Sequence, residues 1–399
     1  MLDMNIDCRI DPIYAVFCVK TMTVLAIVFF CRLDTCLILI NKKIDFAGGK
    51  NEKQTFNNSC SNYFSLFSRC IYLWKSLRRK RKYFDEPDKK TTVVGVLQYV
   101  SHPALDEIYR GIKDGLKEEG LKEGENLEIK FQNGQADQSK LATMSQQLVQ
   151  SDPDVLIGIA TPAAQSLANT TSSIPVVLGA VTDPVGAGLV GSLEKPGGNV
   201  TGVSDQPPVA SQIKLASDLL PNAKKVGILY ASSEDNSKYQ VAQAEEAAKK
   251  EGLEAVKYAV PSTNEIAQTV QVMSRQVDFI YVPLDNTIAN AMQTVVKEAN
   301  KANIPVIPSV DTMVEQGGLA TIGINQYQLG LQSGKMAAEL ASGKEKPETT
   351  PVYMFDQGDT VINQSQADHL GITIPQSMKE KAKIITDESQ QETSKEDDK

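Results

Sequence analysis

The sequence predicts an α/β fold of two doubly wound parallel-sheet lobes joined by a multi-strand hinge. The first observation is a repeat: an apolar stretch at 94–97 leads to Glu-Gly-Leu at 119–121, and after the same interval 226–229 leads to Glu-Gly-Leu at 251–253. The second is that short apolar β-branched runs alternate with helical patterns in both copies. Continuous apolar strands, each followed by a helix, are typical of a parallel sheet covered on both faces.

The repeat extends further along both copies. The apolar run at 154–157 is matched by 278–281, and the one at 174–177 by 304–307. Each copy is too long for a solenoid repeat and has the length of one small domain. Two similar lobes on one chain create a cleft, and clefts are where small molecules bind.

The elements of the first copy follow from local patterns. Leu105, Ile108 and Ile112 recur at helical spacing, and Gly120 ends that helix. The predicted strands are 93–100, 127–131, 155–159 and 174–178, and the predicted helices are 103–120, 138–150 and 161–168.

The second copy repeats this order. Its predicted strands are 226–230, 253–258, 279–282 and 305–307, and its predicted helices are 239–251, 264–275 and 288–302. After Gly323 the chain is expected to return to the first lobe, form a helix over 329–340 and cross again at 352–355. The expected boundaries are 91–204 plus 325–352 for lobe 1 and 205–324 plus 353–386 for lobe 2, with the hinge at 203–204, 324–325 and 353–354.

The two ends of the chain differ from the lobes. Residues 1–90 contain an apolar run at 12–31, long enough to cross a bilayer, and a basic run at 75–82 that suits an anionic membrane surface. This segment is predicted to be a membrane anchor, a poorly ordered leader or a misassigned start. The last residues, 387–399, are charged and predicted to be a disordered tail.

Composition excludes several classes of function. The chain has 399 residues, of which 41% are hydrophobic and 23% charged, which is globular composition. Its net charge of -8 argues against a nucleic-acid surface. All six cysteines fall in the first 70 residues without a C-x-x-C pair, so neither a metal site nor a disulfide framework is predicted for the lobes.

Three enzyme motifs have partial matches in the sequence, but each match lacks a feature that its motif requires. The glycines at 186–191 match G-x-G-x-x-G but do not join a strand directly to its helix, as a dinucleotide site requires. The stretch 330–336 lacks the length and the Ser or Thr of a P-loop. The chain has only two histidines, His102 and His369, and no G-x-S-x-G elbow. A Ser-His-acid hydrolase is therefore not predicted. The sequence therefore predicts neither an enzyme nor a cofactor.

Candidate binding residues follow the strands, because ligands of doubly wound sheets sit at the carboxyl ends of the strands. They are small, polar or helix-capping side chains. The candidates are Gln98, Tyr99, Ser101, Ala160, Thr161, Pro162, Thr182 and Asp183 in the first lobe, and Ser232, Ser233, Asn236, Asp285, Asn286 and Asp311 in the second.

Some of these candidates have a specific expected chemistry. Thr161 reads as an N-cap followed by Pro162 at the first helical position, so the free amides there suit a carboxylate, although capping alone would explain the pair. Asp285 and Asp311 suit an ammonium group; Asp311 fits equally well as an N-cap, so Asp285 is favoured. Tyr99 offers a flat face to an aromatic ring or packs as part of the wall.

The stretches 94–103, 158–165, 232–237 and 282–287 together resemble the tryptophan-type substrate-binding proteins of bacterial ABC transporters. The resemblance runs from about Thr92 to Pro375. It implies a type I periplasmic-binding-protein fold and an aromatic amino acid, with tryptophan favoured, as the ligand. It also implies a membrane permease with its ATPase as partners, and a place on the extracellular face of the membrane.

The N-terminus departs from this family, whose lipoprotein leaders end in small residues before a cysteine. Cys31 follows two phenylalanines and Cys70 follows Ser-Arg, so the kind of anchor stays open. A monomer is expected. A ligand that touches both lobes would favour the closed state, which a permease can read.

Two other classes of protein remain beside this reading. A ligand-sensing ectodomain, or a receptor for a nucleoside-like or other small polar ligand, would use the same cleft. A gene regulator would carry a basic helix-turn-helix ahead of the first lobe, and residues 1–90 show apolar stretches instead.

Overall fold

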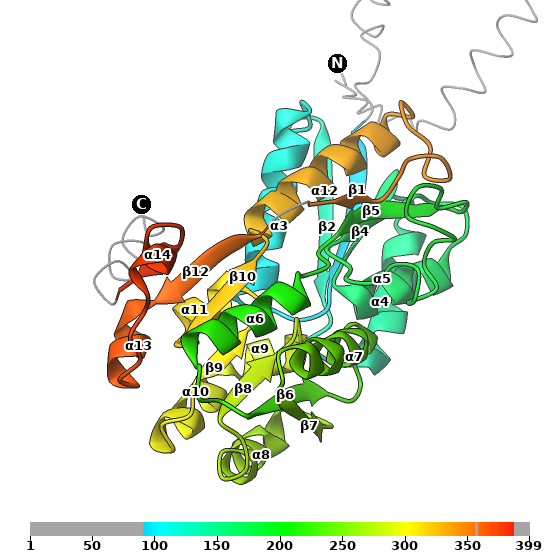
Figure 1. Ribbon diagram of the computed structural model, residues 1–399. Helices are drawn as coiled ribbons and strands as arrows, with labels where there is room; N and C mark the ends of the chain where they lie inside the picture. Colours follow the sequence, from blue (N-terminus) through cyan, green and yellow to red (C-terminus); the bar gives the residue numbers. More distant parts are fainter. Residues whose placement is uncertain (1–90, 356–357, 387–399) are drawn as a thin grey trace, which may run out of the picture. The chain divides into compact units, whose positions relative to one another are not determined.

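The computed structural model describes residues 91–355 and 358–386 (Figure 1). They belong to one compact unit, Lys89–Lys399. The predicted anchor or leader, including the apolar run 12–31, and the predicted tail lie outside the described residues. Within the described ranges, no helix combines the length and the apolar character that crossing a membrane requires.

The first half of this unit is built on a six-stranded sheet in the order β11-β5-β4-β3-β1-β2. All five neighbouring pairs are parallel. The strands are β1 (Thr92–Gln98), β2 (Leu127–Asn133), β3 (Val155–Ile159), β4 (Val176–Gly179), β5 (Val200–Ser204) and β11 (Tyr353–Met354). Every residue of β3, β4 and β5 is buried, which explains why these strands are continuous apolar runs without alternation.

Helices cover both faces of this sheet. They are α3 (Pro103–Glu118), α4 (Gln138–Gln150), α5 (Thr161–Thr170) and α12 (Gln326–Ala341). Strand β2 lies on one side of β1, and β3 and β4 lie on the other. Right-handed crossovers therefore place α3 on one face and α4 and α5 on the opposite face.

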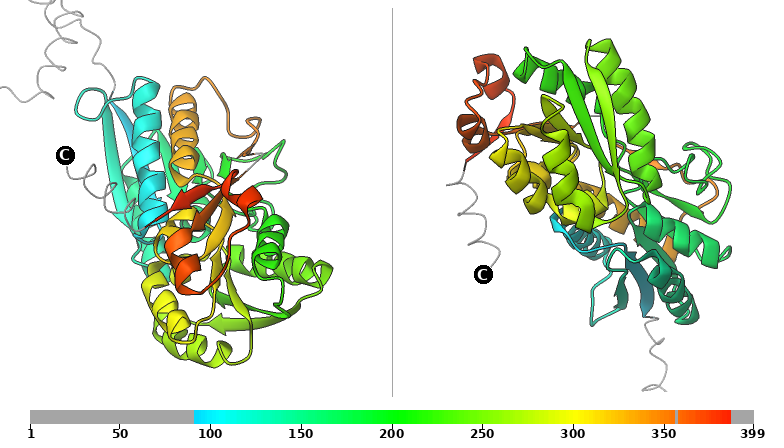
Figure 2. Two further views of the ribbon diagram at one scale, coloured as in Figure 1. Left: turned by 60° about the vertical axis from the view of Figure 1, so that its left-hand side comes forward. Right: turned by 90° about the horizontal axis from the view of Figure 1, so that it is seen from below.

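Helices α3 and α12 run side by side in Figures 1 and 2. Four glycines make this close approach possible: Gly111 and Gly115 in α3, and Gly330 and Gly334 in α12. A Cβ atom on any of them would overlap the backbone of the facing helix. The glycines at 330 and 334 therefore allow helix packing.

The second half contains a four-stranded parallel sheet in the order β7-β6-β8-β9 and a three-stranded sheet in the order β10-β12-β13. Its strands are β6 (Lys225–Ala231), β7 (Glu254–Val260), β8 (Phe279–Val282), β9 (Val306–Pro308), β10 (Ala320–Gly323), β12 (Asp359–Asn363) and β13 (Lys383–Ile385). The pair β10/β12 is antiparallel. The α/β class with parallel sheets is confirmed, and the small mixed sheet is an addition that the repeat did not predict.

The helices of the second half depart from the prediction in one place. They are α6 (Val209–Leu219), α7 (Asp235–Lys250), η1 (Thr263–Glu265), α8 (Ile266–Met273), α9 (Asn286–Asn290), α10 (Met292–Lys301), α11 (Asp311–Glu315), α13 (Gln364–His369) and α14 (Gln376–Lys379). The single helix expected over 288–302 is two helices, α9 and α10, separated at Ala291. Helix α9 thus gains its own N-terminus beside the strand ends.

The chain passes between the two halves three times: from β5 to α6, from β10 to α12 and from β11 to β12. Strand β11 pairs with β5, so Tyr353 and Met354 lie in the six-stranded sheet rather than beyond the expected boundary at 352. The apolar core of the first half is distinct from the two clusters of the second half. One residue of α3, Ala104, joins a cluster of the second half, so the halves are in contact.

Candidate functional site

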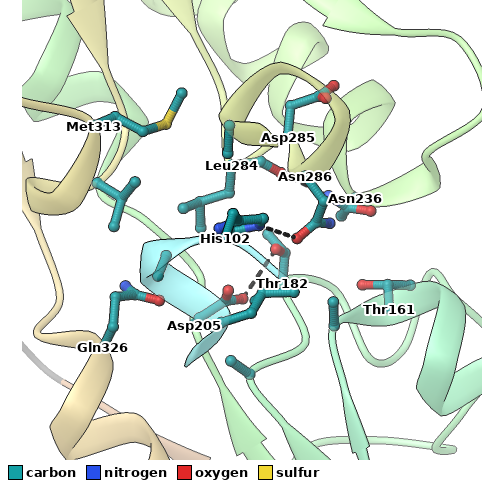
Figure 3. A pocket seen from close by; sticks show the side chains of 16 residues that line it. His102, Thr161, Thr182, Asp205, Asn236, Leu284, Asp285, Asn286, Met313 and Gln326 are labelled. Carbon is teal, nitrogen blue, oxygen red and sulfur yellow. Dashed lines mark hydrogen bonds between the residues drawn. The ribbon is translucent and has the colours of Figure 1, made fainter. Parts of the chain in front are cut away.

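A cavity lies where the two halves meet (Figure 3). It is bordered by the carboxyl ends of β1, β3, β4 and β5 from the first half and by the loops before α7, α9 and α11 from the second. Its lining residues are His102, Ala104, Leu105, Ala160, Thr161, Ala180, Thr182, Asp205, Asn236, Leu284, Asp285, Asn286, Ala289, Val310, Met313 and Gln326. Its lining combines apolar side chains with a few polar groups, as small-molecule sites do.

The N-terminus of α5 forms one wall of the cavity. Ala160, not Thr161, is the N-cap residue, and its φ of 73° turns the chain sharply from β3 into the helix. Thr161 and Pro162 are the first two helical residues, and no side chain caps this end. The prediction that Thr161 is the N-cap is therefore wrong. Since an uncapped first turn leaves amides without a helical partner, this wall can receive an anion.

Thr182 and Asp205 form the polar floor beside this wall. Thr182 follows β4 and Asp205 follows β5, so the parallel order of the two strands brings them together. The hydroxyl of Thr182 donates to Oδ1 of Asp205 over 2.9 Å. Burial raises the pKa of Asp205 to about 6. Within the described residues, Thr182 is the one side chain that donates to the Asp205 carboxylate.

Glu234 and Asp285 hold the N-terminus of α9 on the opposite wall. Oδ1 of Asp285 accepts from the amide of Ile288 over 2.9 Å, and Oδ2 accepts from the amide of Ala231 over 2.6 Å. Asp285 is thus the N-cap of α9, whereas Asp311 is the first residue of α11. The alternative that Asp311 is an N-cap is therefore wrong, because Val310 is the N-cap of α11.

Glu234 is fully buried and accepts five hydrogen bonds, a long one of 3.4 Å from Nδ2 of Asn236 and four from Asn286 and Thr287. The amide and side-chain Nδ2 of Asn286 donate to Oε2 over 3.1 and 2.6 Å, and the amide and hydroxyl of Thr287 donate to Oε1 over 2.8 and 2.7 Å. Burial first, and then the nearby charge of Glu234, raise the pKa of Asp285. No basic side chain of the described residues forms an ion pair with either carboxylate; backbone and polar donors compensate them.

A hydrogen bond joins the two halves at the cavity. Nε2 of His102, before α3, lies 3.2 Å from Oδ1 of Asn286 in α9. Because Nδ2 of Asn286 already donates to Glu234, its Oδ1 is the acceptor, and Nε2 of His102 carries the hydrogen. Burial lowers the pKa of His102, consistent with a neutral ring. A second, exposed bond between the halves runs from Nε2 of Gln138 to the carbonyl of Ser233 over 3.0 Å.

Asn236 carries an unused acceptor in this cavity. Its side chain is 5% exposed, and Nδ2 donates to the carbonyl of Leu284 over 2.6 Å. Oδ1 is buried and has no hydrogen-bond partner in the described part of the chain. A buried polar atom of this kind is costly unless a ligand or a water molecule satisfies it.

The structure gathers part of the predicted site. Six candidates line the cavity: Ala160, Thr161, Thr182, Asn236, Asp285 and Asn286. The remaining eight do not line it: Gln98, Tyr99, Ser101, Pro162, Asp183, Ser232, Ser233 and Asp311.

The candidates outside the cavity have other surroundings. Tyr99 is 2% exposed and belongs to the apolar core of the first half, and Ser101 is exposed and donates to Asp106. Ser232 and Ser233 are also exposed. Asp183 borders a neighbouring hollow, which shares Thr161 and Asn236 with the cavity. Each of these candidates follows a strand, yet its side chain does not line the cavity.

Sequence reasoning missed several lining residues, chiefly His102, Asp205, Met313 and Gln326. Asp205 and Gln326 directly follow the predicted crossings at 203–204 and 324–325. The sequence predicts a hinge at both crossings and no contact with the ligand. The signal that could have found them is that a hinge beside a cleft also borders the ligand.

Comparisons with known proteins agree on a family. The family model for ABC transporter substrate binding protein matches residues 93–385. A tyrosine-binding protein of Clostridioides difficile (strain R20291) is 40% identical over 276 residues, 69% of this chain and 80% of that protein. A crystal structure of an ABC domain from Streptococcus pneumonia in complex with L-Trp is 52% identical, with a TM-score of 0.73, over 74% of this chain and 100% of that one.

A third structure aligns with a lower TM-score. It is the ligand-free, open structure of a substrate binding protein with adhesive properties from Clostridium difficile, 38% identical over 74% of this chain and 99% of that one. Its TM-score is only 0.58. A conserved domain protein from Vibrio cholerae reaches 0.73 at 39% identity and the same coverage of this chain, so sequence divergence does not explain the lower value.

The family match covers both halves and all three crossings between them, and the cavity lies where the halves meet. The chain belongs to the family of ABC transporter substrate-binding proteins, and it is a binding protein rather than an enzyme.

Proposed function

We propose that this cavity captures an aromatic amino acid, with tryptophan or tyrosine as the physiological ligand, and that the closed protein delivers it to the permease of an ABC importer. The observation that carries the proposal is the division of the cavity. Its lining divides into polar groups, which include an uncapped helix N-terminus and a carboxylate, and apolar side chains. An aromatic amino acid is divided in the same way, into charged backbone groups and an apolar ring.

The ligand carboxylate would bind at the first turn of α5. Thr161 and Ala163 offer amides without a helical partner, and Pro162 has none to offer. No acidic residue occupies this first turn. The partial positive charge at a helix N-terminus adds to these donors.

The ligand ammonium would bind Asp205 in place of Asp285, which the sequence favoured. Both oxygens of Asp285 already accept backbone amides. Asp205 has an oxygen to spare, and Oδ1 of Asn236 is a second acceptor without a partner. Together they provide a charged and a neutral acceptor for a group with three donors.

The aromatic ring would occupy the apolar end of the cavity. Leu105, Ala289, Val310 and Met313 line it, and each is buried by the surrounding fold. A methionine sulfur beside an aromatic ring contributes a favourable contact. The L-Trp complex and the tyrosine-binding protein support the same ligand class, since both are similar to this chain over most of its described residues.

Delivery follows from contacts with both halves. A ligand held by Thr161 and Asp205 on one side and by Asn236 and Met313 on the other favours the closed arrangement, which a permease can distinguish from the open one. The family membership supports a membrane permease and its ATPase as partners. We place the protein on the extracellular face of the cell membrane, held there by its N-terminal segment.

The test is calorimetric titration of the unit 89–399 with tryptophan, tyrosine, phenylalanine and glucose. The Streptococcus structure, whose whole length matches 74% of this chain, indicates that this part folds alone. Micromolar or tighter binding of an aromatic amino acid is expected, with at least a tenfold loss in Asp205→Asn. The control is Asp183→Asn, because Asp183 borders the neighbouring hollow and not the cavity.

Two results would contradict the proposal. Binding of a nucleoside or sugar without any amino acid would replace the ligand class. Equal losses in the two variants would show that Asp205 does not bind the ammonium.

A further inference from the structure

We infer that Gln326 determines specificity by accepting a hydrogen bond from the ligand ring, so that the cavity favours aromatic amino acids with a ring N–H or O–H donor over phenylalanine. The inference rests on the proposed function and names the residue that selects among the aromatic ligands. Tryptophan and tyrosine carry such a donor, and phenylalanine does not.

The amide of Gln326 is fixed in one orientation. Gln326 is the first residue of α12, directly after the second crossing, and its side chain is 5% exposed. Nε2 donates to the carbonyl of Ile324 over 2.8 Å. Because a carbonyl can only accept, the nitrogen must face Ile324, and Oε1 is left as the free end. No residue in the described ranges donates to that oxygen.

A count of the acceptors that line the cavity leaves Gln326 for the ring. The oxygens of Asp285 accept backbone amides, and Oδ1 of Asn286 accepts from His102. Asp205, Asn236 and the hydroxyls of Thr161 and Thr182 hold the remaining acceptors near α5, where the amino-acid backbone is proposed. At the apolar end, Leu105, Ala289, Val310 and Met313 have no oxygen or nitrogen in their side chains. Gln326 is therefore the acceptor that the amino-acid backbone does not use.

The positions agree with this division. Figure 3 shows Thr161 and Gln326 on opposite sides of the cavity, with Asp205 between them. Met313 lies on the same side as Gln326. A ligand with its carboxylate at Thr161 and its ammonium at Asp205 extends its side chain toward Gln326. A ring donor then meets Oε1, and a ring without one leaves that oxygen buried and unpaired.

The expected size of the effect follows from the unpaired acceptor. Leaving a buried acceptor without a donor corresponds to roughly a tenfold change in affinity. The ring contact itself is nearly the same for all aromatic ligands. Discrimination therefore shows in the ratio of two dissociation constants rather than in either value alone.

The first experiment changes the ligand and leaves the protein intact. Tryptophan is compared with 3-benzothienylalanine, in which sulfur replaces the ring N–H, and tyrosine with phenylalanine, by calorimetry on the unit 89–399. About tenfold weaker binding of the analogue that lacks the donor is expected in at least one pair. A ratio near one in both pairs would overturn the inference, even if every ligand binds well.

The second experiment assigns the effect to Gln326. Gln326→Met removes the acceptor and should bring the ratio close to one, whereas Gln326→Glu keeps an oxygen and should preserve the preference. Met313→Leu is the matched control: it changes the same end of the cavity without changing an acceptor, and should leave the ratio as in the wild type. An unchanged ratio in Gln326→Met, or an equal loss for every ligand, would overturn the inference.

Folding and function can be separated in this design. Melting temperatures identify a variant that fails to fold, and in that case the Gln326→Glu protein and the wild-type ratios decide. If no aromatic amino acid binds the wild-type protein, the proposed function itself fails. If they bind without discrimination, only the role of Gln326 fails.

Discussion

The two walls of the cavity use their carboxylates differently. On the second-half wall, Glu234 and Asp285 accept seven hydrogen bonds from α9 and its neighbours, so the fold uses their acceptors. On the first-half wall, Asp205 accepts from Thr182 and keeps an oxygen toward the cavity, and α5 begins without a side-chain cap. A polar residue that follows a strand can therefore either stabilise the fold or bind the ligand. Whether it has hydrogen-bonding capacity left over distinguishes the two roles.

The largest effect should come from the scaffold wall. Glu234→Gln places an amide NH₂ against the donors of Asn286 and Thr287 and removes the charge that they stabilise. We expect a loss of about 3 kcal/mol in the free energy of unfolding, because several buried donors lose their acceptor. Chemical denaturation of the unit 89–399 measures it.

The matched variant is Asp205→Asn, which makes the same change of chemistry on the other wall. Its free energy of unfolding should stay within about 0.5 kcal/mol of the wild type, since burial opposes ionisation of Asp205 and few bonds depend on it. A similar loss of stability in both variants would refute the distinction between the walls.

The next effect is a pH dependence of ligand affinity. Burial raises the pKa of Asp205 to about 6, and a bound ammonium would lower it again by favouring the charged form. Below pH 6 the free protein therefore holds a proton that must leave on binding. Affinity should be full above pH 6 and fall by up to about tenfold per pH unit below it. Titrations from pH 4.5 to 8 measure the slope.

Asp311 provides the control for this slope. Burial also raises its pKa to about 6, but it does not line the cavity. The slope should vanish in Asp205→Asn and persist in Asp311→Asn. Persistence in Asp205→Asn would assign the proton to another group.

The sequence predicted the sheets better than the site. Continuous apolar strands and the internal repeat depend on local pattern and burial, so the parallel sheets could be predicted. The break between α9 and α10 could not, because apolar periodicity runs through 288–302 and the turn at Ala291 is a tertiary outcome. The three-stranded sheet joins segments far apart in the chain, and its pairing leaves no local signal.

The choice among carboxylates was beyond the sequence for a similar reason. Asp285 and Asp205 both follow buried strands, and nothing local shows that Asp285 meets the amides of Ala231 and Ile288. Glu234 lies in the stretch 232–237, yet four of its donors belong to residues 286 and 287, far away in the sequence. A residue type can be read from the sequence, whereas the bonds that it has left over depend on the fold.

The smallest expected effect concerns the two hydrogen bonds that join the halves. The bond from His102 to Asn286 is buried, and the bond from Gln138 to Ser233 is exposed. His102→Phe keeps a ring but leaves Oδ1 of Asn286 without its donor when the halves close, so the closed state becomes less populated. We expect about threefold weaker ligand affinity from this variant, and less than twofold from Gln138→Ala, where water replaces the lost bond.

Affinity alone would not separate closure from direct contact, since His102 also lines the cavity. Small-angle X-ray scattering makes the separation, because opening the halves increases the radius of gyration. At saturating ligand, His102→Phe should retain a larger radius than the wild type if the buried bond helps to hold the halves together. An unchanged radius with weaker binding would make His102 a wall of the cavity only, and a larger radius in Gln138→Ala alone would transfer the closing role to the exposed bond.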